Sequence, residues 1–315
     1  MSKLYLGIDT SNYTTSVAVY DAENHSVRQN KKLLSVKTGE VGLRQSEAVF
    51  QHIKQLPDII DGLVWDKERI VAIGVSSRPR NVEGSYMPCF MVGETVAKSI
   101  SSVCSIPVYK TSHQVGHVIA ALYSCQRLDL IKSDDPFIAF HVSGGTTDCL
   151  LIRADGEEVI TATEISSSLD LKAGQLIDRV GVMLGLEFPC GKELEKLASL
   201  STAKFKPKAT IKCGSCCLSG VENQCRNMLD KGSDRCDIAL FALKSVEAAI
   251  YDMTTFAIDK FGSLPVVYAG GVMSDKLIRG RLESSFDSYF AEPAFSQDNA
   301  VGVAIFSALK DGCVI

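Results

Sequence analysis

The chain has 315 residues, of which 46% are hydrophobic and 22% charged, and its formal net charge at pH 7 is −4. This apolar content excludes disorder as the main state. The sequence contains no run of about 18 uncharged apolar residues, the length that a membrane-spanning helix needs. The negative balance argues against a chain that wraps nucleic acid mainly by charge. It leaves open a local basic cluster, either a solvated loop or a binding patch, at Lys204, Lys206, Lys208 and Lys212.

The N-terminus and the cysteines bear on the compartment. The apolar pattern of residues 4–8 follows directly on Met-Ser-Lys, which leaves no room for a secretory signal. Eleven cysteines, an odd number, in a long chain without an export signal are typical of reduced thiols. We therefore expect a cytoplasmic protein that makes no membrane contact.

In the first part of the chain, apolar strands alternate with helical stretches. Strands are expected at residues 4–9, 15–20, 70–76 and 107–109, and helices at 46–60, 90–102 and 114–123. A polar stretch at residues 132–136 follows and ends in a proline, which blocks helix continuation, so we interpret it as a linker.

The same theme starts again after the linker. Strands are expected at residues 137–142, 149–152 and 265–268, and helices at 173–184, 237–261 and 299–309. The alternation predicts an α/β fold with mainly parallel core strands. Both parts open with a strand, a small polar loop and a second strand, which predicts a duplicated lobe. We place the lobes at residues 1–132 and 133–315, with a ligand cleft between them, and the last helix could pack back on the first lobe.

Three strand ends carry loops of small residues. They are Asp9-Thr10-Ser11, Ser143-Gly144-Gly145-Thr146 and Ala269-Gly270-Gly271-Val272. Backbone N–H groups in such turns can hold a phosphate, so three of them in a duplicated α/β pattern predict a nucleotide site. The P-loop and GxGxxG patterns are missing from these strand ends, which disfavours those two nucleotide-binding classes.

His113 and His117 lie four residues apart, on one face of an expected helix. Two imidazoles at this spacing can share a metal ion; the alternative is a capped helix start with one solvated and one packed ring. Asp298, ahead of the last helix, is a candidate third ligand, and its alternative role is a plain N-cap. Gln114 stands where a metallopeptidase HExxH motif needs its general-base glutamate.

Cys213 and Cys216 have the CxxC spacing of a metal site, with Cys217 beside them. A second CxxC pair is missing, and free cysteine packs well as a small hydrophobe. We favour structural packing of this cluster over a second metal site.

Taken in order, these motifs resemble the TsaD family of tRNA threonylcarbamoyladenosine synthases, once catalogued as O-sialoglycoprotein endopeptidases. The resemblance extends from Leu4 to about Leu309. His113-Gln114-Val115-Gly116-His117 is similar to the family's H-x-E-G-H, and Val142 to Thr146 to its V-S-G-G-H/N. The remaining similar segments are residues 173–178 (A-G-E-A-F-D in the family), 184–191 (L-G-L-x-Y-P-G-G), 218–221 (F-S-G-L), 270–272 (G-G-V) and 297–299 (T-D-N).

The resemblance implies a two-lobed actin-like, Hsp70-like ATPase fold of the ribonuclease H type. It implies one metal ion, iron or zinc, on His113, His117 and Asp298, and ATP or an acyl-adenylate as the nucleotide. The implied product is threonylcarbamoylated adenosine beside the anticodon of tRNA, made together with a small paralogue and an ATPase partner. The implied nucleotide contacts are Ser143, Gly144, Gly145, Thr146, Gly174, Asp178, Gly191, Gly270, Gly271 and Asp275, the last where the family usually has Asn.

Several positions depart from the family pattern. The first loop has Asn12-Tyr13-Thr14-Thr15 where the family has C-D-E-T, so the acidic pair is missing and Ser11 and Thr14 are the catalytic candidates left in this loop. Gln175 replaces a glutamate. His141 stands where archaeal relatives have a tyrosine near the metal, so it is either a further metal ligand or a strand histidine bonded to the backbone.

The loop around Arg78 and Arg80 enlarges the family's G-P-G-L-x-G segment and could bind an anion or be solvated. We expect a divergent paralogue of the transferase. The alternative is a catalytically reduced nucleotide-binding paralogue that scaffolds a partner complex, and a metallopeptidase ranks third.

Overall fold

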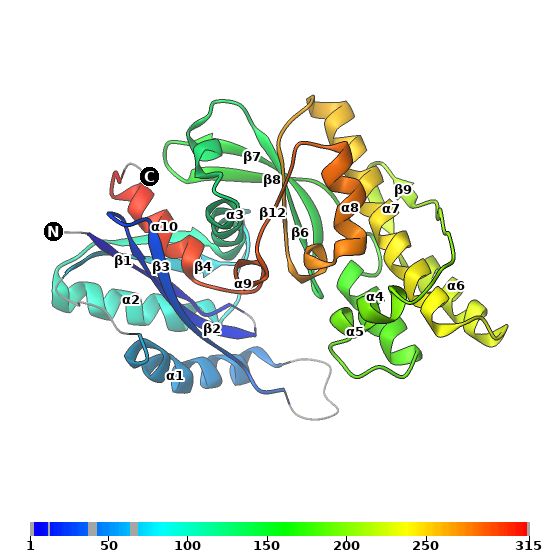
Figure 1. The fold of residues 1–315 in the computed structure, drawn as a ribbon. Helices are drawn as coiled ribbons and strands as arrows, with labels where there is room; N and C mark the ends of the chain where they lie inside the picture. Colours follow the sequence, from blue (N-terminus) through cyan, green and yellow to red (C-terminus); the bar gives the residue numbers. More distant parts are fainter. Residues whose placement is uncertain (1–2, 12, 37–42, 64–68, 314–315) are drawn as a thin grey trace. The chain divides into compact units, whose positions relative to one another are not determined.

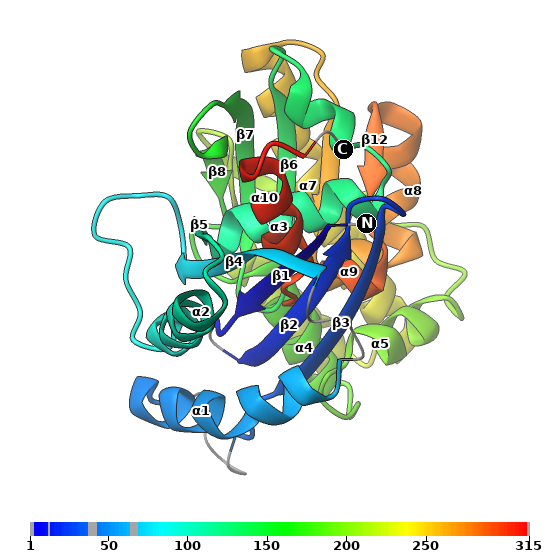
Figure 2. The ribbon, with the colours of Figure 1, turned by 90° about the vertical axis from the view of Figure 1, so that its left-hand side faces the viewer.

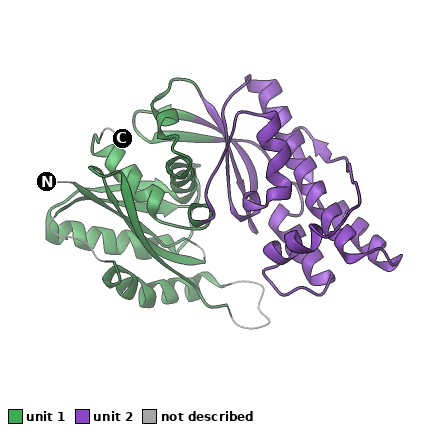
Figure 3. Ribbon diagram, viewed as in Figure 1, with its two compact units in different colours: residues 1–135, 153–162, 294–315 green, residues 136–152, 163–293 purple. Residues whose placement is uncertain are grey.

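The computed structural model describes residues 3–11, 13–36, 43–63 and 69–313. The chain divides into two compact units (Figure 3). Unit 1 comprises Met1–Asp135, Arg153–Ala162 and Ala294–Ile315, and unit 2 comprises Pro136–Ile152 and Thr163–Pro293. The C-terminal helix α10 (Val301–Lys310) therefore belongs to unit 1 although it ends the chain.

Unit 1 is built on a sheet whose described strands follow the order β3-β2-β1-β4-β5. Strand β1 pairs antiparallel with β2 and parallel with β4, which pairs parallel with β5. Helices α1 and α2 pack on one face of the sheet and α3 and α10 on the other (Figure 2). The strands are Leu4–Asp9, Thr14–Asp21, Ser26–Leu33, Ile70–Arg78 and Val108–Ser112, and helices α1 to α3 are Gln45–Asp61, Phe90–Cys104 and His113–Ser124.

Unit 2 repeats this strand order. Its sheet runs β12-β11-β6-β7-β8, in which β6 pairs antiparallel with β7 and parallel with β11, which pairs parallel with β12. Strand β6 thus corresponds to β1 and β11 to β4, which confirms the predicted duplicated α/β fold. The strands are Phe137–Val142, Thr147–Asp155, Val159–Ser167, Val266–Ala269 and Ser288–Phe290, of which residues 153–155 of β7 and 159–162 of β8 fall in unit 1.

The core of unit 2 is centred on the long helix α7 (Arg235–Phe261), which is apolar over most of its length. Helices α4, α5, α6 and α8 pack against α7 (Figure 1). They are Ala173–Met183, Gly191–Ala198, Ser219–Asp230 and Lys276–Ser285, and a two-stranded ribbon of β9 (Thr210–Lys212) and β10 (Ser215–Cys217) completes the unit. None of the described helices is long and apolar enough to cross a bilayer.

Strands β3, β8 and β12 were not predicted from the sequence, and all three lie at sheet edges. An edge strand has fewer buried side chains, so its sequence lacks the apolar run that marks β1, every residue of which is buried.

Helices α3 and α10 cross with their backbones in contact. A Cβ built on Gly302 of α10 would lie 1.8 Å from the carbonyl oxygen of Gly116 in α3, so only glycine fits there. A Cβ on Gly116 would in turn lie 2.9 Å from Cγ2 of Val303. This close approach fixes α3 relative to the start of α10.

We expect Gly302→Ala to lower the free energy of unfolding by about 3 kcal/mol, because the added methyl must push two helix backbones apart. Urea unfolding followed by circular dichroism measures the effect. Gly280→Ala in α8 is the matched control, since nothing lies within 4 Å of a Cβ there. That control should be neutral or gain roughly 0.5–1 kcal/mol. Equal stability of the two variants would contradict the proposed crossing.

His52 of α1 is fully buried in unit 1. Its Nδ1 lies 2.8 Å from Thr15 Oγ1, and the Thr15 hydroxyl donates to Gln55 Oε1 at 3.0 Å. Nδ1 therefore donates to the Thr15 oxygen. Burial lowers the pKa of His52 to about 4, although the Asp9 carboxylate opposes this shift.

A neutral buried ring makes stability depend on pH. The unfolded state binds a proton on His52 near pH 6.5 and the folded state only near 4, so this contribution is full above pH 6.5 and lost as the pH falls toward 4. Between pH 7 and 5 we expect the free energy of unfolding to drop by about 2 kcal/mol more in the parent than in His52→Asn. Urea titrations at the two pH values test this, with the exposed His25→Asn as control. The same pH dependence in parent and His52→Asn would refute the assignment.

Candidate metal centre and nucleotide-binding loops

His113 and His117 lie on the first turns of α3. Ser112 caps the helix, its Oγ accepting the Val115 N–H at 3.2 Å, so His113 is the first helical residue. The four-residue spacing stacks the two rings on one face, and their Nε2 atoms are 2.9 Å apart.

Asp298 joins the histidine pair from the loop between α9 (Pro293–Ser296) and α10. Its Oδ1 lies 3.3 Å from Nε2 of His117 and 3.6 Å from Nε2 of His113. Asn299, not Asp298, serves the helix start, because its Oδ1 accepts the Val301 N–H at 3.0 Å. Asp298 is therefore free of a capping role and its carboxylate faces the two rings.

The ligand atoms of His113, His117 and Asp298 lie within 4.8 Å of one another. Within the part of the chain that the structure describes, this is the one group of three or more His, Cys, Asp or Glu side chains placed to hold a metal ion. Two imidazole nitrogens and one carboxylate oxygen suit zinc with an open fourth position, or iron(II) with further open positions. The donor set thus fits the ions that the family resemblance implies.

Asp9, which the sequence analysis placed in a phosphate-binding loop and not at the metal centre, orients His113. Its Oδ2 accepts the Nδ1–H of His113 at 2.7 Å, and its Oδ1 accepts the Ser11 N–H at 2.7 Å. Asp9 is 1% exposed, at the carboxyl end of β1. A carboxylate on the far nitrogen fixes the ring and its tautomer, which directs Nε2 of His113 toward His117 and Asp298.

Two further side chains hold Asp298. The Thr14 hydroxyl donates to its Oδ2 at 3.1 Å, which leaves Oδ1 for the histidine side. The Lys31 ammonium donates to the backbone oxygen of Asp298 at 3.4 Å and to Oε1 of Gln297 at 3.5 Å. The adjacent strands β1, β2 and β3 therefore each contribute one residue that positions this centre.

The electrostatics of the cluster favour a cation. Burial disfavours a charged ring, but the carboxylates of Asp9 and Asp298 outweigh it and raise the pKa of His113 to about 10. Burial and the His113 charge lower the pKa of His117. Hydrogen bonds and charge from the imidazoles hold the pKa of Asp298 well below its usual range despite its burial. With two carboxylates ionised and one ring protonated, the cluster has a net negative charge.

The predicted phosphate loop of unit 2 follows β6 as a tight turn. The Ser143 N–H donates to the Thr146 carbonyl at 2.8 Å, and a Cβ on Gly144 or Gly145 would meet nothing within 4 Å. The turn abuts the start of α4, since a Cβ on Gly174 would lie 2.6 Å from the Gly144 nitrogen. It also abuts the end of β11, because the Cβ of a side chain at Gly270, whose φ is +101°, would lie 2.1 Å from the Val142 oxygen. These small-residue loops are thus brought together, with Gly271 at the start of a short 3-10 turn.

Asp178 of α4 is hydrogen-bonded to Cys190, the residue just before Gly191 and α5. The Cys190 N–H donates to Asp178 Oδ1 at 2.9 Å, and Gly191 begins α5 with open space around it. Burial raises the pKa of Asp178. Asp275 caps α8 by accepting the Leu277 and Ile278 N–H groups on Oδ1, so its role includes helix capping. Burial and the nearby Glu195 carboxylate raise the pKa of Asp275 to about 6.

The remaining predicted residues are placed as follows. His141 lies on β6 in unit 2, in register with Asp148, whereas the three clustered ligands belong to unit 1. Ser11 is buried, and its Oγ has no hydrogen-bond partner within the described chain. Arg78 pairs with Glu158 at 3.3 Å. None of the eleven cysteines, each of which lies within the described residues, forms a disulfide.

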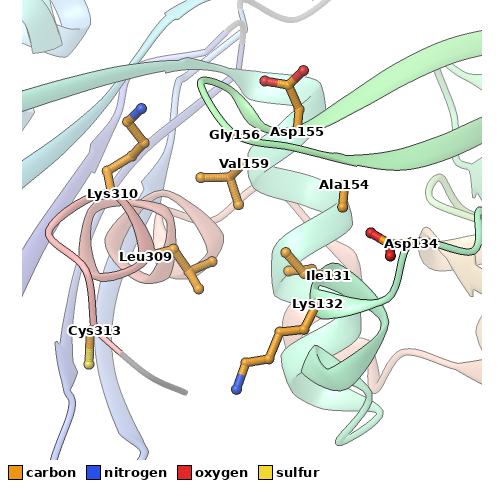
Figure 4. Close-up of a pocket in the computed structure, with 10 residues that line it drawn as sticks. All are labelled: Ile131, Lys132, Asp134, Ala154, Asp155, Gly156, Val159, Leu309, Lys310 and Cys313. Atoms are coloured by element: carbon orange, nitrogen blue, oxygen red, sulfur yellow. The ribbon is translucent and has the colours of Figure 1, made fainter.

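Unit 1 also contains an open pocket of about 630 Å³ (Figure 4). Its centre is apolar and is formed by side chains such as Ile131, Val159 and Leu309. Two lysines and two aspartates lie around this centre. None of the predicted site residues lines this pocket.

Comparison with known proteins gives a family and a fold. The sequence model described as "TsaD: tRNA N6-adenosine threonylcarbamoyltransferase" matches residues 27–305. Component A of (R)-2-hydroxyglutaryl-CoA dehydratase from Acidaminococcus fermentans is 15% identical with a TM-score of 0.56, and the match covers 99% of this chain and 100% of that one. Full-length HypF in the phosphate- and nucleotide-bound form is 13% identical with a TM-score of 0.60, over 96% of this chain and 54% of that one. A ROK family glucokinase from Streptomyces griseus, in complex with glucose and AMPPNP, is 11% identical with a TM-score of 0.54, over 97% and 99% of the chains. At these identities the structures show the fold alone, and they confirm the actin-like ATPase fold.

We expect Asp9→Asn to weaken zinc or iron(II) binding by about 10- to 100-fold, because the amide no longer fixes the tautomer of His113. Titration of the apoprotein against a competing chelator measures the dissociation constant. Asp9→Glu, which keeps the charge, should recover part of the affinity, and the exposed Asp61→Asn is the control for a lost charge. Unaltered affinity in Asp9→Asn would refute the positioning role.

Proposed function

Because the chain belongs to the TsaD family of tRNA N6-adenosine threonylcarbamoyltransferases, we propose that it is a metal-dependent acyltransferase. The proposed donor is a threonylcarbamoyl or related carbamoyl adenylate, and the acceptor is an adenosine next to the anticodon of tRNA. The observation that carries this proposal is the cluster of His113, His117 and Asp298. Both histidines lie on α3, Asp9 accepts a hydrogen bond from His113, and Thr14 donates one to Asp298. We further propose that the chain is a divergent paralogue within the family.

In this proposal, iron or zinc is held by Nε2 of His113, Nε2 of His117 and a carboxylate oxygen of Asp298. The ion supplies Lewis-acid polarisation of the acyl carbonyl oxygen. The chain's own contribution is orientation. Asp9 keeps the proton of His113 on Nδ1, and Thr14 occupies Oδ2 of Asp298 so that Oδ1 stays turned toward the rings.

We assign the adenylate to the loops of unit 2. Nothing lies within 4 Å of a Cβ built on Gly144 or Gly145, so a phosphate can approach this turn, in which the Gly145 N–H also donates to Ser143 Oγ at 3.4 Å. Asp178 has one carboxylate oxygen left for a ribose hydroxyl. The acceptor nitrogen forms a bond to the acyl carbon and releases one proton to solvent, while the bond from that carbon to the phosphate oxygen breaks and AMP leaves with its electron pair. Gly174, Gly191, Gly271 and Asp275 complete the proposed nucleotide contacts.

A second function is favoured by one observation in the first loop. The chain has Tyr13 and Thr14 where the family has an acidic pair, and the Thr14 hydroxyl is engaged with Asp298. A paralogue without these carboxylates could bind nucleotide and metal yet support a partner complex instead of turning over. In either case the proposed partners are a small paralogue and an ATPase protein.

The test measures metal content and transfer in the same preparations. We expect the parent to bind one iron or zinc ion per chain and to transfer a labelled acyl group from its adenylate to tRNA. The double variant His113→Ala, His117→Ala should lose at least nine-tenths of the metal and the transfer, because a lone carboxylate binds these ions weakly. His25→Asn should keep both. Unchanged metal content in the double variant would contradict the proposal, and a metal-loaded parent without transfer would favour the scaffold.

A further inference from the structure

Residues 203–212 of unit 2, the last three of which form β9, make up a segment with two different sides. Burial alternates strictly along it: residues 204, 206, 208, 210 and 212 are exposed, and the residues between them are half-buried. This is the side-chain period of an extended strand. The exposed side carries four lysines, which we call the lysine row: Lys204, Lys206, Lys208 and Lys212.

The inner side of the segment is anchored to the core of unit 2. Phe205 packs edge-to-face on Phe241 of α7, with 5.5 Å between ring centroids. Ala209 and Ile211 pack against the same core, and Pro207 restricts the backbone between them. The lysine row is therefore carried by a backbone segment whose other side is packed on the core of unit 2.

The end of the segment is fixed by a hairpin. Strand β9 pairs with β10 through Cys213 and Gly214, whose φ angles are +48° and +83°. Two adjacent residues of positive φ are typical of the tight type I′ turn. Cys213 is therefore a turn residue, and Cys216, which is buried, packs as a small hydrophobe.

The charge of the row is uncompensated. Between residues 197 and 221 the sequence contains these four lysines and no aspartate or glutamate, in a chain whose net charge is −4. No hydrogen bond or salt bridge to any of the four ammonium groups occurs within the described residues. A concentrated positive stripe on an acidic protein is the electrostatic footprint of a polyanion site.

The spacing of the row fits the phosphates of a nucleic-acid strand, with Thr210 in place of a lysine at one position. Alternate residues of an extended chain are about 6.6 Å apart, and roughly 6 to 7 Å separates successive phosphates of an extended nucleic-acid strand. The apolar side chains of the segment point inward, so it offers nothing to insert into a bilayer.

We propose that the lysine row is a binding surface for the phosphate backbone of an RNA strand. The choice of RNA rests on the function proposed above, and the surface itself rests on the geometry of residues 203–212. From Lys204 to Lys212 the row covers eight residue steps, or about 27 Å in an extended chain, which corresponds to about four nucleotide steps.

The test uses the full chain and an unmodified tRNA transcript, with fluorescence anisotropy across about 50 to 200 mM salt. The row variant is K204Q/K206Q/K208Q/K212Q. The matched control removes four exposed lysines that lie outside the row, K54Q/K98Q/K231Q/K260Q, and so changes the net charge equally. We expect the row variant to bind at least tenfold more weakly and the salt slope of log K to fall by about 3. The control should change affinity less than threefold.

Equal weakening by both variants, or none by either, would overturn the proposal. Vesicles rich in phosphatidylserine and poly-glutamate are tested alongside, and binding of either as tight as that of tRNA, lost in the row variant, would also overturn it. Metal content and binding of an ATP analogue should be unchanged in the row variant. Anisotropy measures tRNA binding without turnover, so absence of transferase activity would not change this measurement. Likewise, equal tRNA binding by the row variant and the parent would not contradict the proposed transferase function.

Discussion

The centre of unit 1 depends on one buried ionic hydrogen bond, between Asp9 and His113. An ionised carboxylate with 1% exposure is strongly disfavoured unless it is paired. Here the Nδ1–H of His113 and the N–H of Ser11 satisfy both oxygens, and the pKa of Asp9 stays below its usual value despite burial. The bond favours a protonated His113 ring, which lies against the His117 ring. The carboxylate of Asp298 balances this positive charge.

Backbone packing supplies the rest of the geometry. The glycine contact between α3 and α10 brings the helix that carries both histidines against the start of the helix that follows Asp298. Thr14 and Lys31 then hold the aspartate and its loop from neighbouring strands. The ligand positions are thus set by a sheet and two helices of one unit, which is the rigid support that a preorganised metal site requires.

The replacement of the acidic pair has a physical consequence in this arrangement. At position 14 a hydroxyl donates to Asp298, whereas a carboxylate could not donate and would add a further negative charge to the cluster. The first loop therefore stabilises the metal ligands and supplies no general base of its own. This chemistry explains why both a transferase and a binding paralogue are consistent with the same centre.

Sequence reasoning predicted what is encoded locally. The apolar run of β1 gave its bounds, Leu4–Asp9, and the four-residue spacing gave the histidine pair. It missed the edge strand β3 because that strand has no apolar run, and with it Lys31. It also missed Asp9 as a partner of His113, because nothing near either residue indicates that β1 and α3 meet. Asp298 was found only from its place before the last helix and from the family resemblance.

The most direct test of this account is a crystal of the iron- or zinc-loaded protein examined by anomalous diffraction at the metal edge. The account predicts one ion bound by Nε2 of His113, Nε2 of His117 and a carboxylate oxygen of Asp298, with Asp9 still bonded to His113. An ion bound instead by the thiols of residues 213–217, or a loaded crystal with no anomalous peak between the two rings, would contradict it.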